Sequence, residues 1–181
     1  MQQYRNAVKD KLAAGQLVLG LSIRLLRTPD AAKIAKATDH DFLFIDMEHS
    51  ALSFESVVDM SVAALDSGIT PIVRVIGHDH WQASRVLDCG AMGVVVPHVN
   101  TGAEARRAVD ACKYPPLGHR SMSAGFPHFD FQALPPAQAA RCTNRSACSQ
   151  SSRYHCCMSI MPTVPRLPRP STRASKHRIN C

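Results

Sequence analysis

The feature that most constrains this chain is a regular alternation of strand-like and helix-like segments over roughly its first 134 residues. Apolar runs typical of buried strands occupy residues 17–23, 42–46, 70–75 and 92–99. Helix-like segments follow them at residues 28–37, 53–68, 79–90 and 101–114, and a polar helix is expected first, over residues 2–14. Strands that alternate with helices across short connections predict βα units on a parallel sheet. We therefore predict an α/β fold with four βα units.

Local signals indicate where these helices begin and end. Thr28, Pro29 and Asp30 offer a cap, a proline for the first turn and an acidic residue near the positive helix end. Thr101 is a second predicted cap, and Gly68 is a predicted stop at the end of the helix that begins near residue 53. We therefore expect short, local stretches of sequence to set the helix boundaries.

Repeated βα units predict a (β/α)₈ TIM-type barrel, although a complete barrel takes about 250 residues. This chain has 181 residues and shows only about the first four units, followed by an irregular tail. We assign residues 1–140 to a partial barrel domain and residues 141–181 to the tail. Such a half barrel leaves its first and fourth strands as open edges, and we expect Leu19, Phe44, Val73 and Val95 to point inward without partners across the axis.

Titratable residues follow the strand-like runs directly. Asp46, Glu48 and His49 come at the end of the second run, and Arg74 lies near the end of the third. In a barrel the carboxyl ends of the strands share one mouth, where such folds keep their chemistry. An imidazole exchanges protons near neutral pH, and a guanidinium within an apolar strand needs a partner because burying it alone is costly. We therefore predict a functional site at this mouth.

Several motifs in this order resemble one family. The runs LFIDMEHS, PIVRV and GHDHWQASRVLDCGAMGVVVPHVNTGAEARRAVDACKYPPLGHRS are similar to the class II pyruvate aldolases of the HpcH/HpaI aldolase and citrate lyase superfamily. The resemblance covers about residues 15–134 and implies a (β/α)₈ barrel. It also implies reversible cleavage of a 4-hydroxy-2-oxo acid to pyruvate and an aldehyde, through an enolate stabilised by a divalent metal, magnesium or manganese. The same enolate chemistry serves citramalyl or malyl thioester lysis, which stays open.

The resemblance also implies residue roles. His49 is expected to be the catalytic acid/base, with Asp46 as the residue that orients it. Arg74 is expected to bind the substrate carboxylate or the enolate oxygen, and Glu48 to hold water near the metal. The alternatives are a surface or capping role for His49 and a structural ion pair for Arg74. His78, His80 and His98 also lie near the predicted mouth, and we interpret them as solvated loop residues or local hydrogen-bonding groups rather than metal ligands.

Further expectations concern the remaining residues of the first domain. The stretch 118–121, with the segment MSAGFP after it, resembles a family loop that covers the mouth and can contribute to a neighbouring subunit's site, and a flexible loop without further role is the alternative. Trp81 and Met92 are predicted to lie in the core. Cys89 and Cys112 are interpreted as reduced, small apolar residues on helices.

The tail differs in kind from the rest of the chain. The net charge is +7, yet residues 1–140 hold all 14 acidic residues and 13 of the 21 Lys and Arg, so the basic excess lies in residues 141–181. Relatives in the family bind the metal through a Glu and an Asp on the fifth and sixth strands, but this chain has no acidic residue after Asp130. The family's metal ligands are thus expected to be absent. We interpret the tail as disordered or frameshift-derived.

Alternatives to an impaired aldolase follow from the same tail. The chain is then a non-catalytic fragment or a binding protein, in which scattered arginines contact nucleic acid phosphates. We regard nucleic acid binding as the weaker hypothesis, and a zinc module as weaker still because the paired CxxC spacing is missing. The expected partners are a small 2-oxo acid and an aldehyde, with a homo-oligomer in the intact family. No membrane span or signal peptide is recognisable, which favours a cytoplasmic location.

Overall fold

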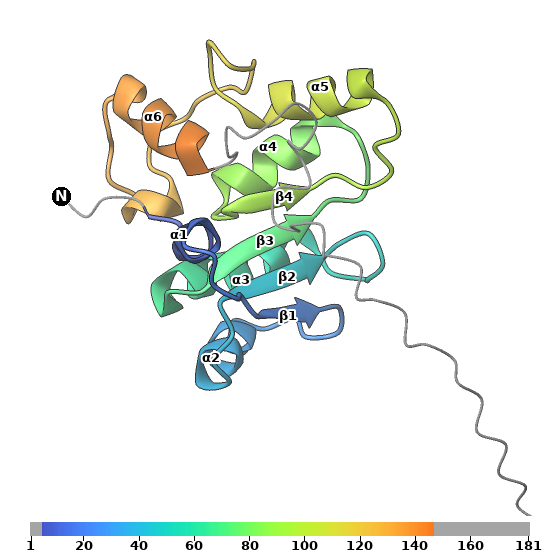
Figure 1. Cartoon of the computed structure of the whole chain (residues 1–181), viewed down its shortest axis with the longest axis vertical. Coiled ribbons are helices and arrows are strands. Elements are labelled where there is room, and N and C mark those ends of the chain that lie inside the picture. The colour runs from blue at the N-terminus through green and yellow to red at the C-terminus, as the bar shows by residue number, and fades with distance from the viewer. Residues whose placement is uncertain (1–4, 147–181) are drawn as a thin grey trace, which may run out of the picture.

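A computed structural model describes residues 5–146 of the chain. Within that range, four parallel strands form one sheet in the order β1-β2-β3-β4, with helices between them (Figure 1). The elements are α1 (Ala7–Ala13), β1 (Gly20–Ile23), α2 (Asp30–Ala37), β2 (Phe42–Asp46), α3 (Phe54–Ser67), β3 (Thr70–Arg74), α4 (His80–Asp88), β4 (Gly93–Val95), α5 (Gly102–Cys112), η1 (Pro127–Phe129) and α6 (Pro136–Ser146). The predicted α/β fold with four βα units is confirmed.

The main core lies between the sheet and the helices α2 and α3. Register pairs Leu43 with Pro71 and Ile45 with Val73, so these side chains share one face of the sheet. That face packs against Ala31, Ala32, Ala35, Val57, Met60 and Ala64. Val73 therefore belongs to the helix-covered core, and its predicted place inside a barrel is wrong. Side chains alternate between faces along a strand, which puts Phe44 and Val95 on the opposite face.

Leu19 was also predicted to point inward from the first strand, but it precedes β1 and is about half exposed. The apolar run 17–23 predicts a longer strand than the structure has. β1 pairs only with β2, and the register starts at Gly20 opposite Phe42, where β2 begins. A strand extends only as far as its neighbour offers backbone partners, so the length of β2 limits that of β1.

The local end signals agree closely with the helices. The Ser53 side chain accepts a hydrogen bond from the N–H of Ser56, and α3 ends before Gly68, whose φ of 75° is left-handed. Thr101 and Glu104 form a reciprocal capping box at the start of α5. At α2 the structure places Pro29 at the cap position, without a side-chain hydrogen bond, in place of the predicted Thr28.

Trp81 is not a core residue, contrary to expectation. The buried positions of α4 are Ala83, Val86 and Leu87, which follow the three-and-four spacing of one helix face. Trp81 lies off that stripe and is about half exposed, whereas Met92, just before β4, is buried as predicted. Cys89 is a free thiol, and Cys112, the last residue of α5, is buried.

The loop after α5 packs at the end of the sheet where the strands begin, opposite to the predicted mouth. Gly118 lies so close to the end of α5 that an added Cβ would be 2.6 Å from the carbonyl oxygen of Lys113. The Arg120 side chain forms an ion pair with Asp88, the last residue of α4. Helices in βα units run antiparallel to the strands, so the ends of α4 and α5 lie beside the strand beginnings. Within one chain this loop does not cover the mouth.

The helix α6 crosses the predicted boundary between residues 140 and 141. The Thr143 hydroxyl donates to the carbonyl of Ala139, and the Asn144 side chain bonds both the N–H and the carbonyl of Tyr114. These contacts fix α6, whose buried residues Ala139 and Thr143 lie one turn apart on one face of the helix. The rest of the predicted tail lies outside the described residues, and so do the prediction of disorder and the frameshift hypothesis. No helix within residues 5–146 has the length and apolar character to cross a membrane.

Candidate active site

Asp46 and Arg74 are the last residues of β2 and β3, and the sheet register pairs them side by side. Arg74 Nε donates to Asp46 Oδ1 at 2.9 Å, and Arg74 Nη2 donates to Oδ2 at 2.6 Å. This fork-to-fork arrangement is the strongest geometry available to an arginine and a carboxylate. The Asp46 side chain is only 2% exposed, and that of Arg74 is 24% exposed. The pair therefore forms the buried base of the site.

Asp46 also organises the turn that follows β2. Its Oδ1 accepts hydrogen bonds from the backbone N–H groups of Glu48 at 3.0 Å and His49 at 3.2 Å. The Ser50 hydroxyl donates to the Asp46 carbonyl oxygen and closes the turn from the other side. The described contact of Asp46 is thus with the backbone of His49, whereas the sequence led us to expect contact with its imidazole.

The electrostatic setting keeps the pair charged. Hydrogen bonds from Arg74 hold the pKa of Asp46 below its usual value of 3.8, against the opposing effect of burial, and the N–H of His49 acts in the same direction. The Asp46 hydrogen bond raises the pKa of Arg74 correspondingly. At neutral pH, one fixed negative charge and one fixed positive charge face each other at the strand ends.

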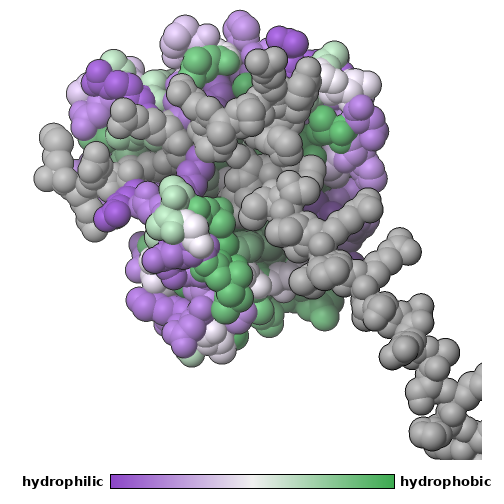
Figure 2. Space-filling view, in the orientation of Figure 1, coloured by the Kyte–Doolittle hydropathy of each residue, from purple (hydrophilic) through white to green (hydrophobic). Residues whose placement is uncertain are grey.

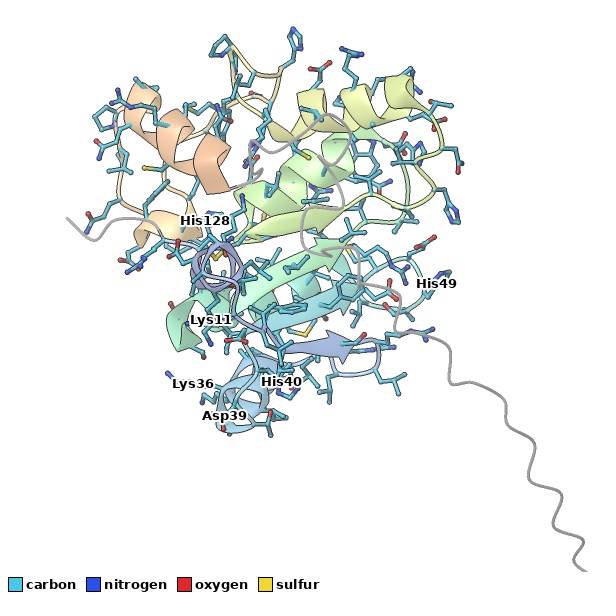
Figure 3. The ribbon with its side chains drawn as sticks, viewed as in Figure 1. Lys11, Lys36, Asp39, His40, His49 and His128 are labelled. Carbon is cyan, nitrogen blue, oxygen red and sulfur yellow. The ribbon has the colours of Figure 1, made fainter. Side chains whose placement is uncertain are left out.

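Glu48 lies at the centre of a second set of contacts. Its Oε2 is 3.1 Å from Arg74 Nη1 and 3.7 Å from His49 Nε2, and its Oε1 is 2.8 Å from His98 Nε2. The Glu48 carboxylate is largely buried, whereas the His49 imidazole is 56% exposed. A proton-exchanging ring thus reaches solvent from a charged, mostly buried base, and Figure 3 shows His49 at the end of the sheet opposite to His40.

Two residues of this cluster were not assigned to the site from the sequence. His98 was expected to be solvated or locally hydrogen-bonded, and it bonds Glu48. Arg24, directly after β1, donates from Nε and Nη2 to the carbonyl oxygen of His49 at 3.1 and 2.7 Å. Both follow strands, so the rule that found Asp46 and Arg74 is the signal that points to them. His78 bonds the Pro97 carbonyl instead, and His80 is exposed.

A divalent metal does not fit the described residues. Within residues 5–146, no three His, Cys, Asp or Glu side chains are grouped in a way that can hold a metal ion. The two carboxylates at the mouth, Asp46 and Glu48, both pair with the guanidinium of Arg74. A hard cation needs several oxygen ligands, and a carboxylate already neutralised by arginine is a poor one.

Comparison with known proteins places these residues in context. The family model described as HpcH/HpaI aldolase/citrate lyase matches residues 24–158, which extends past the resemblance seen in the sequence alone. A 4-hydroxy-4-methyl-2-oxoglutarate aldolase from Hapsidospora irregularis is 43% identical over 152 residues, covering 82% of this chain and 56% of the relative. A hydroxypyruvate/pyruvate aldolase from Roseobacter denitrificans is 33% identical over 143 residues, covering 76% and 55%.

Solved structures agree with this picture. The crystal structure of an HpcH/HpaI aldolase from Desulfitobacterium hafniense aligns with a TM-score of 0.71 at 31% identity, covering 76% of this chain and 53% of that one. The citrate synthase SbnG aligns with a TM-score of 0.68 at 30% identity, covering 78% and 53%. The chain spans about half the length of the curated relatives it matches.

Proposed function

The chain belongs to the HpcH/HpaI aldolase/citrate lyase family, and on that basis we propose that its site acts in the reversible cleavage of a 4-hydroxy-2-oxo acid to pyruvate and a carbonyl compound. One observation carries the proposal. A half-exposed imidazole, His49, lies beside the buried ion pair of Asp46 and Arg74 at the ends of adjacent strands. The named relatives support a substrate such as 4-hydroxy-4-methyl-2-oxoglutarate.

The reaction needs a base and a cation, and the site offers both. His49 removes the proton from the C4 hydroxyl, the C3–C4 bond breaks, and the carbonyl product leaves. The electron pair of that bond moves into the 2-oxo acid fragment, which becomes the enolate of pyruvate. Arg74 stabilises the negative oxygen because its positive charge is fixed at all relevant pH values. A proton delivered to C3 completes pyruvate.

The carboxylates act through position in this proposal. Asp46 fixes the 46–50 turn through two backbone N–H groups, and it thereby holds the His49 backbone in place. Glu48 positions the ring, since its Oε2 lies 3.7 Å from His49 Nε2. The metal expected for the family, magnesium or manganese, supplies enolate stabilisation when it is bound, but the ligands for it are not among the described residues of this chain.

The proposal is tested on the full chain by measuring pyruvate release from 4-hydroxy-4-methyl-2-oxoglutarate, with and without manganese. We expect release above the uncatalysed rate, and His49→Gln should lower it by about 100-fold, the loss typical of a missing general base. His40→Gln is the matched control, because His40 lies at the other end of the sheet (Figure 3). Absence of turnover, or turnover that His49→Gln leaves unchanged, contradicts the proposal.

We also propose that the chain assembles with further copies of itself. Within the described residues, β1 and β4 each pair on one side only, so both present an open sheet edge. Leu17, Leu19 and Leu25 are exposed around β1, and Figure 2 shows hydrophobic residues gathered below α1, on the side that carries β1. Open edges and apolar side chains favour association. Light scattering of the purified chain should give a dimer or larger, and a stable monomer contradicts this. The cytoplasmic location stays a prediction.

A further inference from the structure

The two arginines at the mouth differ in how much of their hydrogen-bonding capacity is used. All three guanidinium nitrogens of Arg74 contact carboxylate oxygens of Asp46 or Glu48. Arg24 donates from Nε and Nη2 to a neutral acceptor, the carbonyl oxygen of His49, and Nη1 has no hydrogen-bond partner within residues 5–146. Its Nε is 3.8 Å from Asp46 Oδ2, too far for a hydrogen bond. The positive charge of Arg24 is therefore the less neutralised of the two.

Arg24 is also held in place and open to solvent at once. Its side chain is 58% exposed, yet two hydrogen bonds fix the guanidinium against the 46–50 turn. A long side chain that is already ordered loses less rotamer entropy when it binds a ligand. A planar guanidinium with a remaining donor suits a carboxylate, which it binds with charge assistance.

We propose that Arg24 determines specificity by binding the second carboxylate of a dicarboxylic 2-oxo acid at this mouth. The inference rests on the proposed function, in which the 2-oxo acid end of the substrate lies beside Arg74. Arg24 and Arg74 approach the same oxygen, Asp46 Oδ2, at 3.8 and 2.6 Å, so the two cations flank one carboxylate. A substrate with a single carboxylate uses one of these cations, whereas a dicarboxylate uses both.

The test compares two probes by calorimetry on the full chain: 2-oxoglutarate, a dicarboxylate, and 2-oxobutyrate, a monocarboxylate. We expect Arg24→Gln to weaken 2-oxoglutarate binding by about tenfold, the loss of roughly one charge-assisted contact. Binding of 2-oxobutyrate should change by less than about twofold. Arg27→Gln is the matched control, since it removes the same charge from an exposed position three residues away and should leave both affinities unchanged.

The ratio of the two affinities separates recognition from a structural role. If Arg24 only supported the turn through the His49 carbonyl, Arg24→Gln would weaken both probes equally, and that outcome overturns the inference. Equal binding of the two probes to the unmodified chain, or no binding of either, also overturns it. Release of pyruvate that depends on His49 would leave the proposed function standing in each of these cases.

Discussion

Two arginine–aspartate pairs lie at opposite ends of the strands, and the two pairs differ in which partner is buried. At the mouth, the carboxylate of Asp46 is 2% exposed and the side chain of Arg74 is 24% exposed. At the other end of the strands, the side chain of Arg120 is 3% exposed, and its partner Asp88 is 34% exposed. In each pair one charge is buried and the other reaches water.

The surroundings of the two cations differ accordingly. The Arg120 guanidinium carbon lies 4.6 Å from the ring centre of Tyr114 and 5.9 Å from that of Phe126, so aromatic faces enclose it. Arg74 has one such neighbour, Phe44 at 5.7 Å, and otherwise contacts carboxylates beside an exposed imidazole. The buried cation of the Arg120 pair is suited to packing, whereas the Arg74 cation remains accessible, as its proposed role in the reaction requires.

The largest effect should come from removing the accessible partner of a buried charge. Arg74→Met leaves the Asp46 carboxylate buried without its main partner, and we expect the free energy of unfolding to fall by about 3 kcal/mol, as for a broken buried pair. Asp46→Asn should cost less, since Arg74 can turn to Glu48 and to water. Urea denaturation at pH 7 measures both, and a smaller loss for Arg74→Met would break the comparison.

The second pair should follow the same rule with the residue types exchanged. Asp88→Asn leaves the buried Arg120 without a negative partner, and we expect a loss of about 2 kcal/mol, since the amide oxygen still accepts a hydrogen bond. Arg120→Met should cost less, because Met suits the space between Tyr114 and Phe126 and leaves Asp88 partly solvated. The same denaturation series decides whether the order holds.

As the pH falls, the first loss of stability should come from the end of the sheet that carries Arg120 and His128. Burial lowers the pKa of His128 to about 4 from its usual 6.5, and its Nε2 lies 3.1 Å from the Ala91 carbonyl oxygen. Between these values the unfolded chain binds more protons, so the stability contributed above pH 6.5 is lost as the pH falls towards 4. We expect a loss of about 2 kcal/mol between pH 7 and 4. His128→Gln should remove this dependence, and an unchanged slope would contradict the assignment.

The mouth should respond to acid last and least. The lowered pKa of Asp46 contributes stability above its unfolded value of 3.8, which is lost as the pH falls through the folded value. We therefore expect no effect of this pair between pH 7 and 5, and a loss only below about pH 4. In a His128→Gln background, Asp46→Asn should flatten the stability curve below pH 4. A difference in slope that begins above pH 5 would refute this.

Much of the fold was predictable because its signals are local. The capping residues Ser53 and Thr101 and the terminator Gly68 act over a single turn, and β2 was predicted to the residue from a continuous apolar run. Trp81 and Val73 were misassigned for a different reason. The sequence shows only that both side chains are apolar. Packing against neighbouring elements decides whether Trp81 is buried and which face of the sheet Val73 occupies.

The site divides in the same way. The sequence alone places Asp46, Glu48, His49 and Arg74 at or just after the ends of strands. Because the carboxyl ends of parallel strands lie together, a shared site was predictable. Tertiary structure alone decided that Arg74 is shared between two carboxylates, that Arg24 bonds the His49 carbonyl, and that His98 bonds Glu48. The physical reason is that a hydrogen bond requires its donor and acceptor about 3 Å apart, within a few tenths of an ångström. For residues far apart in sequence, only the folded structure sets that distance.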